Sequence, residues 1–554
     1  MKTNITFTFQ GRTLTARNGQ SLAAALTEAG HRSFRTTAKS DDRGMFCGMG
    51  VCQDCLVTVD GQPNQRACMS PAKDGLTVTQ QIPFPEFSGV AVDTADAVHL
   101  SPDVLVIGGG AGGLSAAIAA AGAGAEVVVL DERKVAGGQY YKQAADGSIL
   151  DAQQSEGAVL VAAAQTAGVT ILSGVEIWGA FDPLLFLAQQ GDTPIIARPK
   201  TAIVATGAYE RPVMVPGWTL PGVMTTGAAQ TLWRSYGTLP GKRVAICGSG
   251  PLNLQVAVEL ARGGADVVRL AERARHPITR PWSALKMALS SPALMVKGIK
   301  MELAMRRLGV KTLNSSDLTS VTQQGGALAA VFQKADGMQD TVIVDAVCMN
   351  AGFEPQNEIL RLLGAKMQYD AKIGHLRCQT GDDMQTNIGG LYAVGDCKGL
   401  GGAPAARDEG IIAGTCAAAT TGFGDAHDLH GVRRRLSGHR RFQSRLWPLY
   451  DITPCKVTSL PMETTICRCE DLTLGDICTG MKDGPGHAGT LKRATRVGMG
   501  RCQGRYCGPV AARMVAEATG KPIENLSFFA PRVPIKPVAI SAILAAEKAM
   551  NGQE

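Results

Sequence analysis

Aromatic residues are scarce in this sequence of 554 residues, where Phe, Tyr and Trp together make up 5%. No apolar stretch reaches the about 18 residues that a membrane-spanning helix needs, and the N-terminus lacks the apolar segment of a secretory signal. The net charge of +7 is small for this length, so it does not favour nucleic acid as a partner. We therefore expect a cytoplasmic protein of three or more domains with no transmembrane segment.

Cysteine, by contrast, is frequent: fifteen are present, and eight of them form two quartets near the two ends. The first quartet reads C-x4-C-x2-C followed by a fourth cysteine, and consists of Cys47, Cys52, Cys55 and Cys68. This is the plant-type spacing of a 2Fe–2S cluster. Zinc prefers two C-x2-4-C knuckles, and a disulfide framework needs a secretory context that the sequence lacks. The spacing therefore predicts a 2Fe–2S site.

The residues around the first quartet predict a β-grasp ferredoxin domain over residues 1–81. Residues 5–9 alternate as a strand, and residues 13–17 can pair back onto them. Ser21 and Gly30 are the expected start and stop signals of an Ala- and Leu-rich helix between them.

The second quartet reads C-x-C, then 32 residues, then C-x4-C, and consists of Cys467, Cys469, Cys502 and Cys507. A four-thiolate 2Fe–2S centre carries net negative charge, which nearby cations stabilise. Cations are concentrated in the second half of this segment: Lys492, Arg493, Arg496, Arg501 and Arg505. We predict a small helical 2Fe–2S module over residues 455–520. A zinc site, or a basic face that only contacts solvent, remains the alternative.

The middle of the chain contains a dinucleotide fingerprint in its full context. A short apolar strand ends at Ile107 and is followed by a glycine-rich turn, an Ala-rich helix and a second strand. In this GxGxxG pattern Gly108 makes the tight turn, Gly110 admits the pyrophosphate, and Gly113 lets the helix pack on the strand. The carboxylates for the ribose are Asp131, which directly follows the second strand, and Glu132 as second choice.

Three further segments indicate that the dinucleotide is FAD. Gly138 and Gln139 lie at the spacing of a second glycine contact after the acidic residues. Thr206 and Gly207 end an apolar strand that reads A-I-V-A-T-G, and Gly395 and Asp396 end another far downstream. Together, in this order, these segments are typical of flavoprotein reductases with two dinucleotide-binding domains.

A second fingerprint repeats the first 140 residues later, with Gly248 and Gly250 in the turn. It departs from the pattern because Asn253 replaces the third glycine and Ala271 stands where Asp131 stands in the first copy. Glu272 could substitute for the missing carboxylate, and Arg273 and Arg275 could meet a phosphate. The sequence leaves open whether this site binds NAD(P), another adenine nucleotide, or nothing.

These observations predict an α/β multidomain protein: a glutathione-reductase-like flavoprotein with two dinucleotide-binding domains, a β-grasp domain in front and a helical cluster module behind. We expect an FAD domain at 102–240 and 341–425, a second nucleotide domain at 241–340, and a tail at 521–554. Disulfide reductases of this fold carry a redox-active cysteine pair beside the flavin. Here no cysteine lies between Cys68 and Cys247, which disfavours that activity.

In this order the modules resemble the large (alpha) subunit of heteromeric FAD-dependent amino-acid and opine dehydrogenases and oxidases. That family includes octopine and nopaline oxidases, dye-linked proline and hydroxyproline dehydrogenases, hydrogen cyanide synthase and heterotetrameric sarcosine oxidase. The ferredoxin part, often a separate small subunit, is fused at the front here. Sarcosine oxidase alpha chains end in a folate-binding region, for which this chain is too short.

The resemblance implies a beta-subunit partner with its own FAD, which oxidises a CH–NH bond of an amino acid, an opine or another secondary amine. This chain would pass the electrons to an acceptor such as a quinone or a dye, with an FMN at the subunit contact in some members. The resemblance allows peripheral association with the inner face of the cytoplasmic membrane. We expect cofactor-binding residues in this chain and no catalytic base.

Two rival hypotheses remain at this point. The first is a self-sufficient NAD(P)H-dependent flavin and iron–sulfur reductase, which needs a working second nucleotide site; Asn253 and Ala271 count against it. The second is a redox scaffold or sensor without catalysis, for which an intact FAD fingerprint is superfluous.

Overall fold

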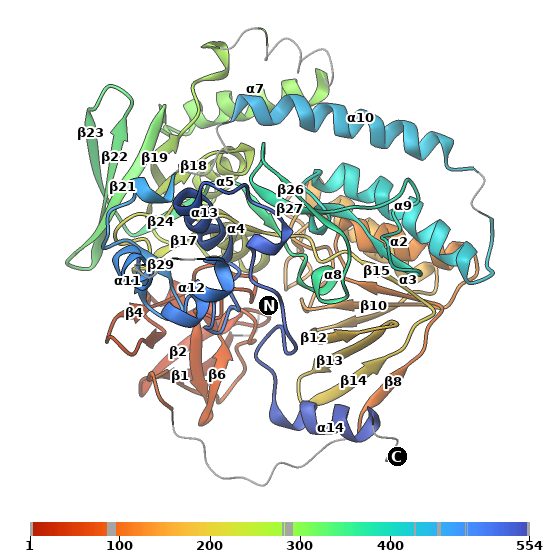
Figure 1. The fold of residues 1–554 in the computed structure, drawn as a ribbon. Coiled ribbons are helices and arrows are strands. Elements are labelled where there is room, and N and C mark those ends of the chain that lie inside the picture. Colours follow the sequence, from red (N-terminus) through yellow and green to blue (C-terminus); the bar gives the residue numbers. More distant parts are fainter. Residues whose placement is uncertain are drawn as a thin grey trace.

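A computed structural model describes residues 4–85, 96–279, 282, 292–425, 428–450, 456–481, 484 and 486–550. Figure 1 shows an N-terminal sheet, two parallel sheets with covering helices, a small helical part and a C-terminal tail. Cys455, the first residue of the expected cluster module, lies outside the described residues, and so do residues 551–554 at the end of the expected tail.

The N-terminal part is a mixed sheet with one covering helix. Its elements are β1 (Asn4–Phe9), β2 (Arg12–Arg17), α1 (Leu22–Glu28), β3 (Arg35–Thr36), β4 (Asp42–Arg43), β5 (Leu56–Val59), β6 (Gln62–Arg66) and β7 (Thr77–Gln80). The five long strands lie in the order β2-β1-β7-β5-β6. The Ala24 N–H donates to Ser21 Oγ at the start of α1, and Gly30, with φ of +86°, follows its end. Both predicted helix signals are therefore confirmed.

The first nucleotide-binding part combines a parallel sheet with a smaller, mainly antiparallel one. Its strands are β8 (Val98–Leu100), β9 (Val104–Ile107), β10 (Val127–Asp131), β11 (Thr170–Ser173), β12 (Val175–Phe181), β13 (Leu185–Gln190), β14 (Thr193–Ala197), β15 (Thr201–Val204) and β28 (Leu391–Ala393). Its helices are α2 (Ala111–Gly122), α3 (Ala152–Thr166) and α9 (Gly402–Thr420). The parallel sheet has the order β11-β10-β9-β15-β28, and the smaller sheet has the order β12-β13-β14-β8. Methyl groups placed at Gly410 or Gly414 of α9 would overlap the backbone of α2, so these glycines allow the two helices to pack closely.

The second nucleotide-binding part repeats this arrangement. Its strands are β17 (Val223–Thr225), β18 (Arg243–Gly248), β19 (Asp266–Glu272), β20 (Thr312–Asn314), β21 (Ser316–Gln324), β22 (Ala327–Lys334), β23 (Gln339–Val344) and β24 (Ala346–Asn350). Its helices are α4 (Thr226–Tyr236), α5 (Pro251–Arg262) and α7 (Pro292–Arg307), with a short turn η1 (Pro277–Thr279). The parallel sheet runs β17-β24-β18-β19-β20, and β21, β22 and β23 form an antiparallel sheet beside it.

The bounds of the second nucleotide-binding part differ from those expected from the sequence. The expected range 241–340 leaves out β17 and β24, which the structure places in its parallel sheet. β24 pairs with both β17 and β18, so the chain completes this sheet before it returns to the first one. A three-residue strand such as β17 is too short for its alternation to be recognised in the sequence.

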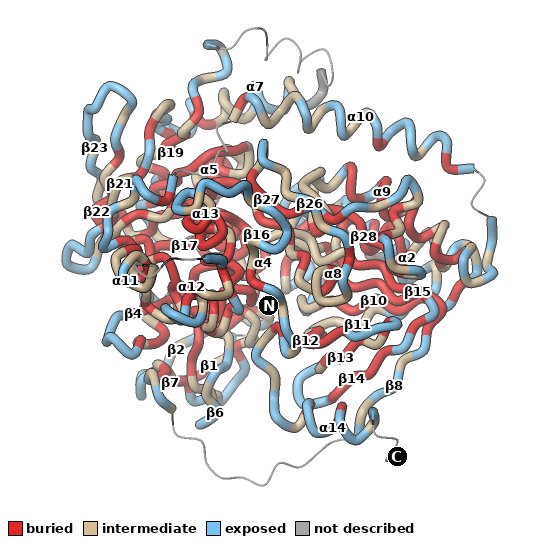
Figure 2. Tube along the Cα trace, viewed as in Figure 1, coloured by how far each residue is buried: buried red, intermediate tan, exposed pale blue. Residues whose placement is uncertain are grey.

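Short elements connect the two parts. They are β16 (Ala208–Glu210), β25 (Phe353–Pro355), α8 (Glu358–Leu362), β26 (Met367–Asp370), β27 (His375–Cys378) and η2 (Gly395–Cys397). The helix α10 (His430–Leu446), of 17 residues, follows α9 and continues into η3 (Trp447–Leu449). α10 packs against α9, where Arg435 and Arg440 bind the buried carboxylates of Asp408 and Glu409. Figure 2 shows buried residues along the strands of the parallel sheets, and α10 exposed along much of its length.

The C-terminal part is a small helical module followed by a tail that lies on the body. Its elements are η4 (Val457–Ser459), β29 (Thr465–Cys467), β30 (Leu472–Thr473), α11 (Leu474–Gly480), α12 (Ala488–Thr495), α13 (Gly508–Thr519), η5 (Asn525–Ser527) and α14 (Ile540–Met550). In the tail, the Ile535 N–H donates to the carbonyl of Trp178 at 2.9 Å, and Ala546 of α14 packs on Leu187 and Ile196.

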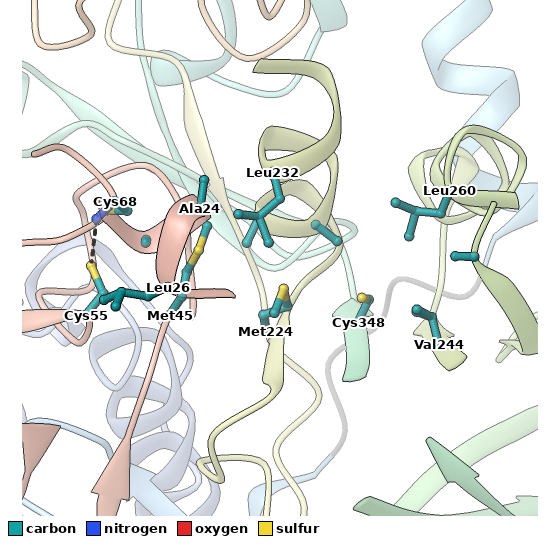
Figure 3. Close-up of a cluster of buried hydrophobic side chains, with 14 of the residues drawn as sticks. Ala24, Leu26, Met45, Cys55, Cys68, Met224, Leu232, Val244, Leu260 and Cys348 are labelled. Carbon is teal, nitrogen blue, oxygen red and sulfur yellow. Dashed lines mark hydrogen bonds between the residues drawn. The ribbon is translucent and has the colours of Figure 1, made fainter. Parts of the chain in front are cut away.

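The core of the N-terminal sheet continues into the second nucleotide-binding part. Figure 3 shows Leu26, Cys55 and Cys68 next to Met224 and Leu232, followed by Cys348, Val244 and Leu260. The N-terminal sheet is thus packed on α4 through buried apolar side chains. Among the described residues, none of the helices has both the length and the apolar character needed to cross a bilayer.

Candidate functional site

The first glycine-rich turn has the backbone that the fingerprint predicts. Gly108 has φ of +109°, and a methyl group placed there would lie 2.5 Å from the Ala205 carbonyl. A methyl group at Gly113 would overlap the Gly108 carbonyl, and one at Gly138 would lie 2.7 Å from Gly110 Cα. No side chain caps the first turn of α2, so its N–H groups point to the space that a pyrophosphate would fill.

Asp131, the last residue of β10, and Glu132, which follows it, have different environments. Oδ1 of Asp131 accepts the Arg133 N–H at 3.1 Å, but Oδ2 is buried and has no hydrogen-bond partner among the described residues. Burial raises the pKa of Asp131 to about 6. A buried oxygen without a partner at this position is what ribose hydroxyls would satisfy.

Glu132, in contrast, is already paired. It binds Arg66 of β6 at 3.0 Å and Lys536 of the tail at 2.5 Å. Burial acts to raise the pKa of Glu132, but Lys536 and Arg66 overcome it and lower the pKa to about 2. The structure therefore favours Asp131 over Glu132 as the ribose ligand, and gives Glu132 a role in holding three parts of the chain together.

The other predicted FAD residues line one large cavity of about 1210 Å³, together with Gly108, Gly110 and Asp131. They are Gly138, Gln139, Thr206, Gly207, Gly395 and Asp396. Thr206 Oγ1 donates to the Gln356 carbonyl at 2.6 Å, which fixes the end of β15. Oδ1 of Asp396 accepts the N–H groups of Gly401 and Gly402, each at 2.9 Å, and so orders the start of α9. These residues fit FAD by their place and their chemistry.

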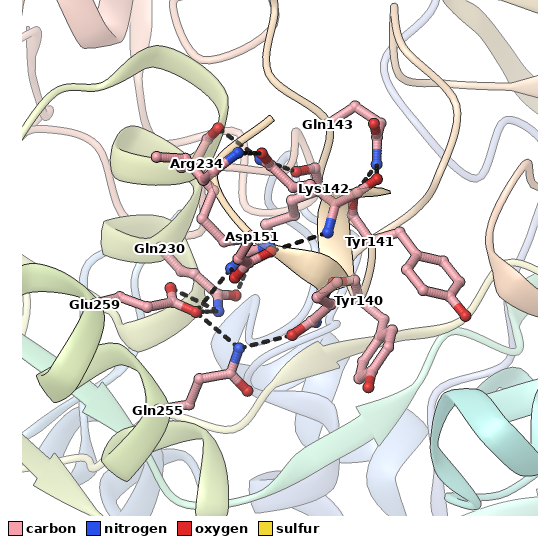
Figure 4. Close-up of polar contacts among 12 residues, drawn as sticks. Tyr140, Tyr141, Lys142, Gln143, Asp151, Gln230, Arg234, Gln255 and Glu259 are labelled. Atoms are coloured by element: carbon pink, nitrogen blue, oxygen red, sulfur yellow. Dashed lines mark hydrogen bonds and ion pairs between the residues drawn. The ribbon is translucent and has the colours of Figure 1, made fainter. Parts of the chain in front are cut away.

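A buried lysine in this cavity was not predicted. Lys142 donates through Nζ to the Gly227 carbonyl at 3.0 Å and to Gln230 Oε1 at 2.9 Å, in the polar network of Figure 4. Burial lowers its pKa to about 7. Glu210 also lines the cavity; it accepts the Gly227 N–H, and burial raises its pKa. The only sequence signal for Lys142 is its place three residues after Gln139.

Gly248 and Gly250 of the second glycine-rich turn are not among the residues that line this cavity, whereas Pro251 and Leu252 at the start of α5 and Glu272 at the end of β19 do line it. In the first sheet Ile107 pairs with Leu130, which makes Gly108 and Asp131 the next residues of the two strands. In the second sheet Gly248 pairs with Glu272, because a bulge between Val267 and Arg269 adds one residue to β19.

Glu272 therefore occupies in the second sheet the position that Asp131 occupies in the first, although an alignment of the two sequence repeats puts Ala271 at that position. Its carboxylate accepts from Ser249 Oγ at 2.6 Å and from the Gly250 N–H at 3.1 Å. Arg273, which the sequence offered to a phosphate, binds Asp317 at 2.7 Å, and Arg275 is exposed. Asn253 is buried and donates to the Asn350 carbonyl at 3.2 Å.

The first cysteine quartet is brought together and is buried. The Cys52 N–H donates to Cys47 Sγ at 3.4 Å, and the Cys68 N–H donates to Cys55 Sγ at 3.5 Å. Although burial acts to raise it, hydrogen bonds from Cys52 and Met49 lower the pKa of Cys47 to about 7. The hydrogen bond to Cys55 raises the pKa of Cys68 well above its ordinary value.

The second quartet has the same arrangement in pairs. Cys467 ends β29, and Cys507 precedes α13. A hydrogen bond from Cys507 lowers the pKa of Cys467, and one from Cys469 lowers the pKa of Cys502 to about 6. Of the neighbouring cations, Arg505 is buried and donates to the Cys502 carbonyl at 2.9 Å, so it is not part of a solvated face.

In each quartet the thiols interact most strongly as two pairs, Cys47 with Cys52 and Cys55 with Cys68 in the first, and Cys467 with Cys507 and Cys469 with Cys502 in the second. Among the described residues, no three Cys, His, Asp or Glu side chains are gathered closely enough to hold a single metal ion. Tetrahedral zinc requires four ligands around one point, whereas a two-iron centre takes one pair of thiolates for each iron. The arrangement in pairs fits 2Fe–2S better than zinc.

Three known protein families match the chain in succession. The 2Fe-2S iron-sulfur cluster binding domain matches residues 2–83, and the sarcosine oxidase A3 domain matches residues 463–548. The pyridine nucleotide-disulphide oxidoreductase family matches residues 102–410, which is more than half of the chain.

Similar proteins are known by sequence and by structure. The A subunit of opine oxidase from Rhizobium meliloti (strain 1021) is 30% identical over 351 residues, which cover 62% of this chain and 76% of that protein. The HcnB subunit of hydrogen cyanide synthase from Pseudomonas protegens is 29% identical over 355 residues, which cover 61% and 74%. The crystal structure of L-proline dehydrogenase from P. horikoshii has a TM-score of 0.72 at 21% identity and covers 98% of both chains, which shows the same fold.

The fold and these matches define an iron–sulfur flavoprotein oxidoreductase. The chain belongs to the pyridine nucleotide-disulphide oxidoreductase family and, within it, to the group of the opine oxidase A subunits. The resemblance and the fold class drawn from the sequence are thereby confirmed.

Proposed function

We propose that this chain is the electron-transfer subunit of a heteromeric dehydrogenase or oxidase. In that enzyme a partner subunit with its own FAD oxidises an amino acid or an opine-type secondary amine, and this chain passes the electrons on to an acceptor such as a quinone or a dye. The names of the relatives support a heteromer, because the opine oxidase and hydrogen cyanide synthase chains are each one subunit of their enzyme.

The proximity of the first thiol quartet to the dinucleotide cavity, and of the two quartets to each other, carries the proposal. Met49, from the first cysteine loop, lines the cavity together with Gly108 and Asp131. Cys47, Cys52 and Cys502 belong to one buried apolar cluster, and Cys469 packs against it. Electron carriers at these places would be close enough to exchange electrons without any movement of the parts.

The residues of this chain bind and orient the cofactors. The glycines of the first turn, Asp131, Thr206 and Asp396 would hold FAD, and each quartet would hold one 2Fe–2S cluster. When bound, FAD accepts or donates an electron pair and the clusters carry single electrons, so together they divide a pair between one-electron acceptors. In this proposal the base that oxidises the amine belongs to the partner. The relay would not require an FMN at the subunit contact, because one flavin and two clusters in this chain would suffice.

Purification of the chain alone and with its co-expressed partner tests the proposal. The chain alone should contain flavin and about four iron atoms, as expected for two 2Fe–2S clusters, and should not be reduced by amines. The complex should reduce a dye with an amino acid or an opine. The proposal would be contradicted if an amine bleached the flavin of the chain without a partner subunit, or if the chain contained zinc in place of iron.

Glu272 favours one alternative function, a self-sufficient NAD(P)H-dependent reductase. Because the bulge puts Glu272 opposite Gly248, a carboxylate lies where a ribose ligand would be needed, although its two oxygens already accept hydrogen bonds from Ser249 and Gly250. Anaerobic mixing with NADH and with NADPH separates the two functions. Prompt bleaching of the flavin, lost in Glu272→Ala, would support the alternative; an unchanged flavin spectrum is the result we expect.

A further inference from the structure

A buried ion pair joins the two cysteine loops. Asp54 lies between Cys52 and Cys55, and Arg468 lies between Cys467 and Cys469. Arg468 Nε donates to Asp54 Oδ2 at 2.6 Å, and Arg468 Nη2 lies 2.5 Å from the same oxygen. The Asp54 and Arg468 side chains are 2% and 4% exposed. Each partner is thus flanked on both sides by predicted cluster ligands.

Neighbouring groups hold this ion pair in one geometry. Arg35 of β3 binds the other oxygen of Asp54 at 2.5 Å. The Arg468 guanidinium lies over the ring of Phe46, 4.0 Å from its centroid, and over that of Trp218 at 4.7 Å. Arg468 Nη1 also donates to the Trp218 carbonyl at 3.0 Å. A planar guanidinium fixed by stacking and by a carboxylate has little freedom to move.

Aromatic rings next to the ligands meet beside the ion pair. Phe46 directly precedes Cys47, and Tyr506 directly precedes Cys507. Their ring centroids are 5.5 Å apart in an edge-to-face arrangement, and both rings are buried. We call Phe46, Asp54, Trp218, Arg468 and Tyr506 the inter-loop contact. Through it the side chains of the two cysteine loops touch directly.

We propose that Asp54 and Arg468 are positioning residues that hold two 2Fe–2S centres at a fixed short separation, so that single electrons pass directly between them. The inference rests on the proposed function, since it requires a cluster in each quartet. One electron leaves one reduced centre, which is oxidised, and enters the other, which is reduced. No bond is made or broken, and the electrons come from the reduced flavin.

The opposite charges of the two residues give the proposal a signature. Asp54 is close to ligands of both centres, so removing its negative charge should make both centres easier to reduce. Removing the positive charge of Arg468 should make both harder to reduce. A residue that acts on only one cluster would shift only that cluster.

Full-length Asp54→Asn, Arg468→Gln and Arg468→Lys variants test this, with Asp408→Asn as the control. Asp408 of α9 is 6% exposed and pairs with Arg435 of α10, which is not part of either cysteine loop, so it controls for the loss of a buried carboxylate. Iron and absorbance first establish that each protein holds both clusters. Redox titration followed by electron paramagnetic resonance then gives the two midpoint potentials and the magnetic interaction between the reduced centres.

We expect both potentials to rise in Asp54→Asn and to fall in Arg468→Gln, and to stay unchanged in Asp408→Asn. Arg468→Lys keeps the charge but not the planar fork, so its potentials should stay near the wild-type values while the magnetic interaction weakens. A shift of one potential only, or a magnetic interaction that is unchanged in all variants, would overturn the inference. Fewer than two clusters in the wild-type protein would instead overturn the proposed function.

Discussion

Lys536 binds Glu132 at 2.5 Å, although 404 positions of sequence separate them. Glu132 follows Asp131, which lines the dinucleotide cavity. Glu132 also binds Arg66 of the N-terminal sheet. One carboxylate therefore joins the flavin-binding part, the ferredoxin part and the C-terminal tail.

Replacing Glu132 should destabilise the whole chain rather than one part. Glu132→Gln removes the carboxylate that Lys536 binds in a largely buried place, while Arg66 keeps Glu176, so we expect a cost of about 3 kcal/mol. Thermal unfolding should show a lower midpoint. The control Asp266→Asn removes an exposed ion pair with Arg243, at 3.8 Å, and should cost less than about 0.5 kcal/mol. Equal losses in the two variants would contradict the role of Glu132.

The contribution of Glu132 should also depend on pH. Its pKa is lowered to about 2 in the folded chain from 4.5, so the folded state favours the ionised form. Its stabilisation is complete above pH about 4.5 and is lost as the pH falls toward 2. The difference in unfolding free energy between wild type and Glu132→Gln should therefore be constant from pH 7 to 5 and shrink below pH 4.5.

Gly138→Ala should abolish flavin binding. The residue has φ of +66°, and the added methyl group would lie 2.7 Å from Gly110 Cα in the glycine-rich turn. The ratio of flavin to protein after purification measures the effect. Gly122→Ala is the matched control on α2, because no atom lies within 4 Å of the added methyl group. Flavin retained by Gly138→Ala would show that the turn is not the binding site.

Flavin affinity should increase with pH through Asp131. The pKa of this residue is about 6, and hydroxyl donors on its free oxygen would favour the ionised form. We expect the flavin dissociation constant to fall by about fivefold between pH 5 and 7. Asp131→Asn should bind flavin about tenfold more weakly and lose this pH dependence. Titration of the apoprotein with FAD, followed by fluorescence, measures both; a parallel pH dependence in the variant would exclude Asp131.

Cys502→Ser should remove one cluster and leave the other. Iron should fall from about four atoms to about two for each chain, and the N-terminal cluster should keep its spectrum. Cys478→Ala, a change in α11 of the same module, should keep all of the iron. If Cys502→Ser retained the full iron content, the second quartet would not be a cluster site.

Much of the fold could be predicted because its signals are local. The turn from Gly108 to Gly113 and the helix start at Ser21 depend on residues next to each other in sequence, where backbone sterics decide the conformation. The C-x4-C-x2-C loop is local in the same sense. The order of these parts along the chain then carried the family resemblance.

What could not be predicted depends on register and on distant contacts. The bulge in β19 moves Glu272 to the position that corresponds to Asp131 in the first sheet, and no residue type in the sequence indicates this bulge. The strand β17 is recognisable only from its neighbour β24. The pairing of Asp54 with Arg468 joins residues 414 positions apart, and either charge alone resembles an ordinary surface residue.

Side chains of α4, such as Leu232, complete the core of the N-terminal sheet. An electron carrier built in this way cannot swing toward its donor and away again, as tethered carriers on long linkers do. In the proposed enzyme the rate of electron transfer within this chain would then depend on distances that are fixed when the chain folds. This rate would not depend on ionic strength or on protein concentration. Excision of residues 1–85 would expose this apolar face on both fragments. The two fragments should therefore aggregate and should not exchange electrons with each other.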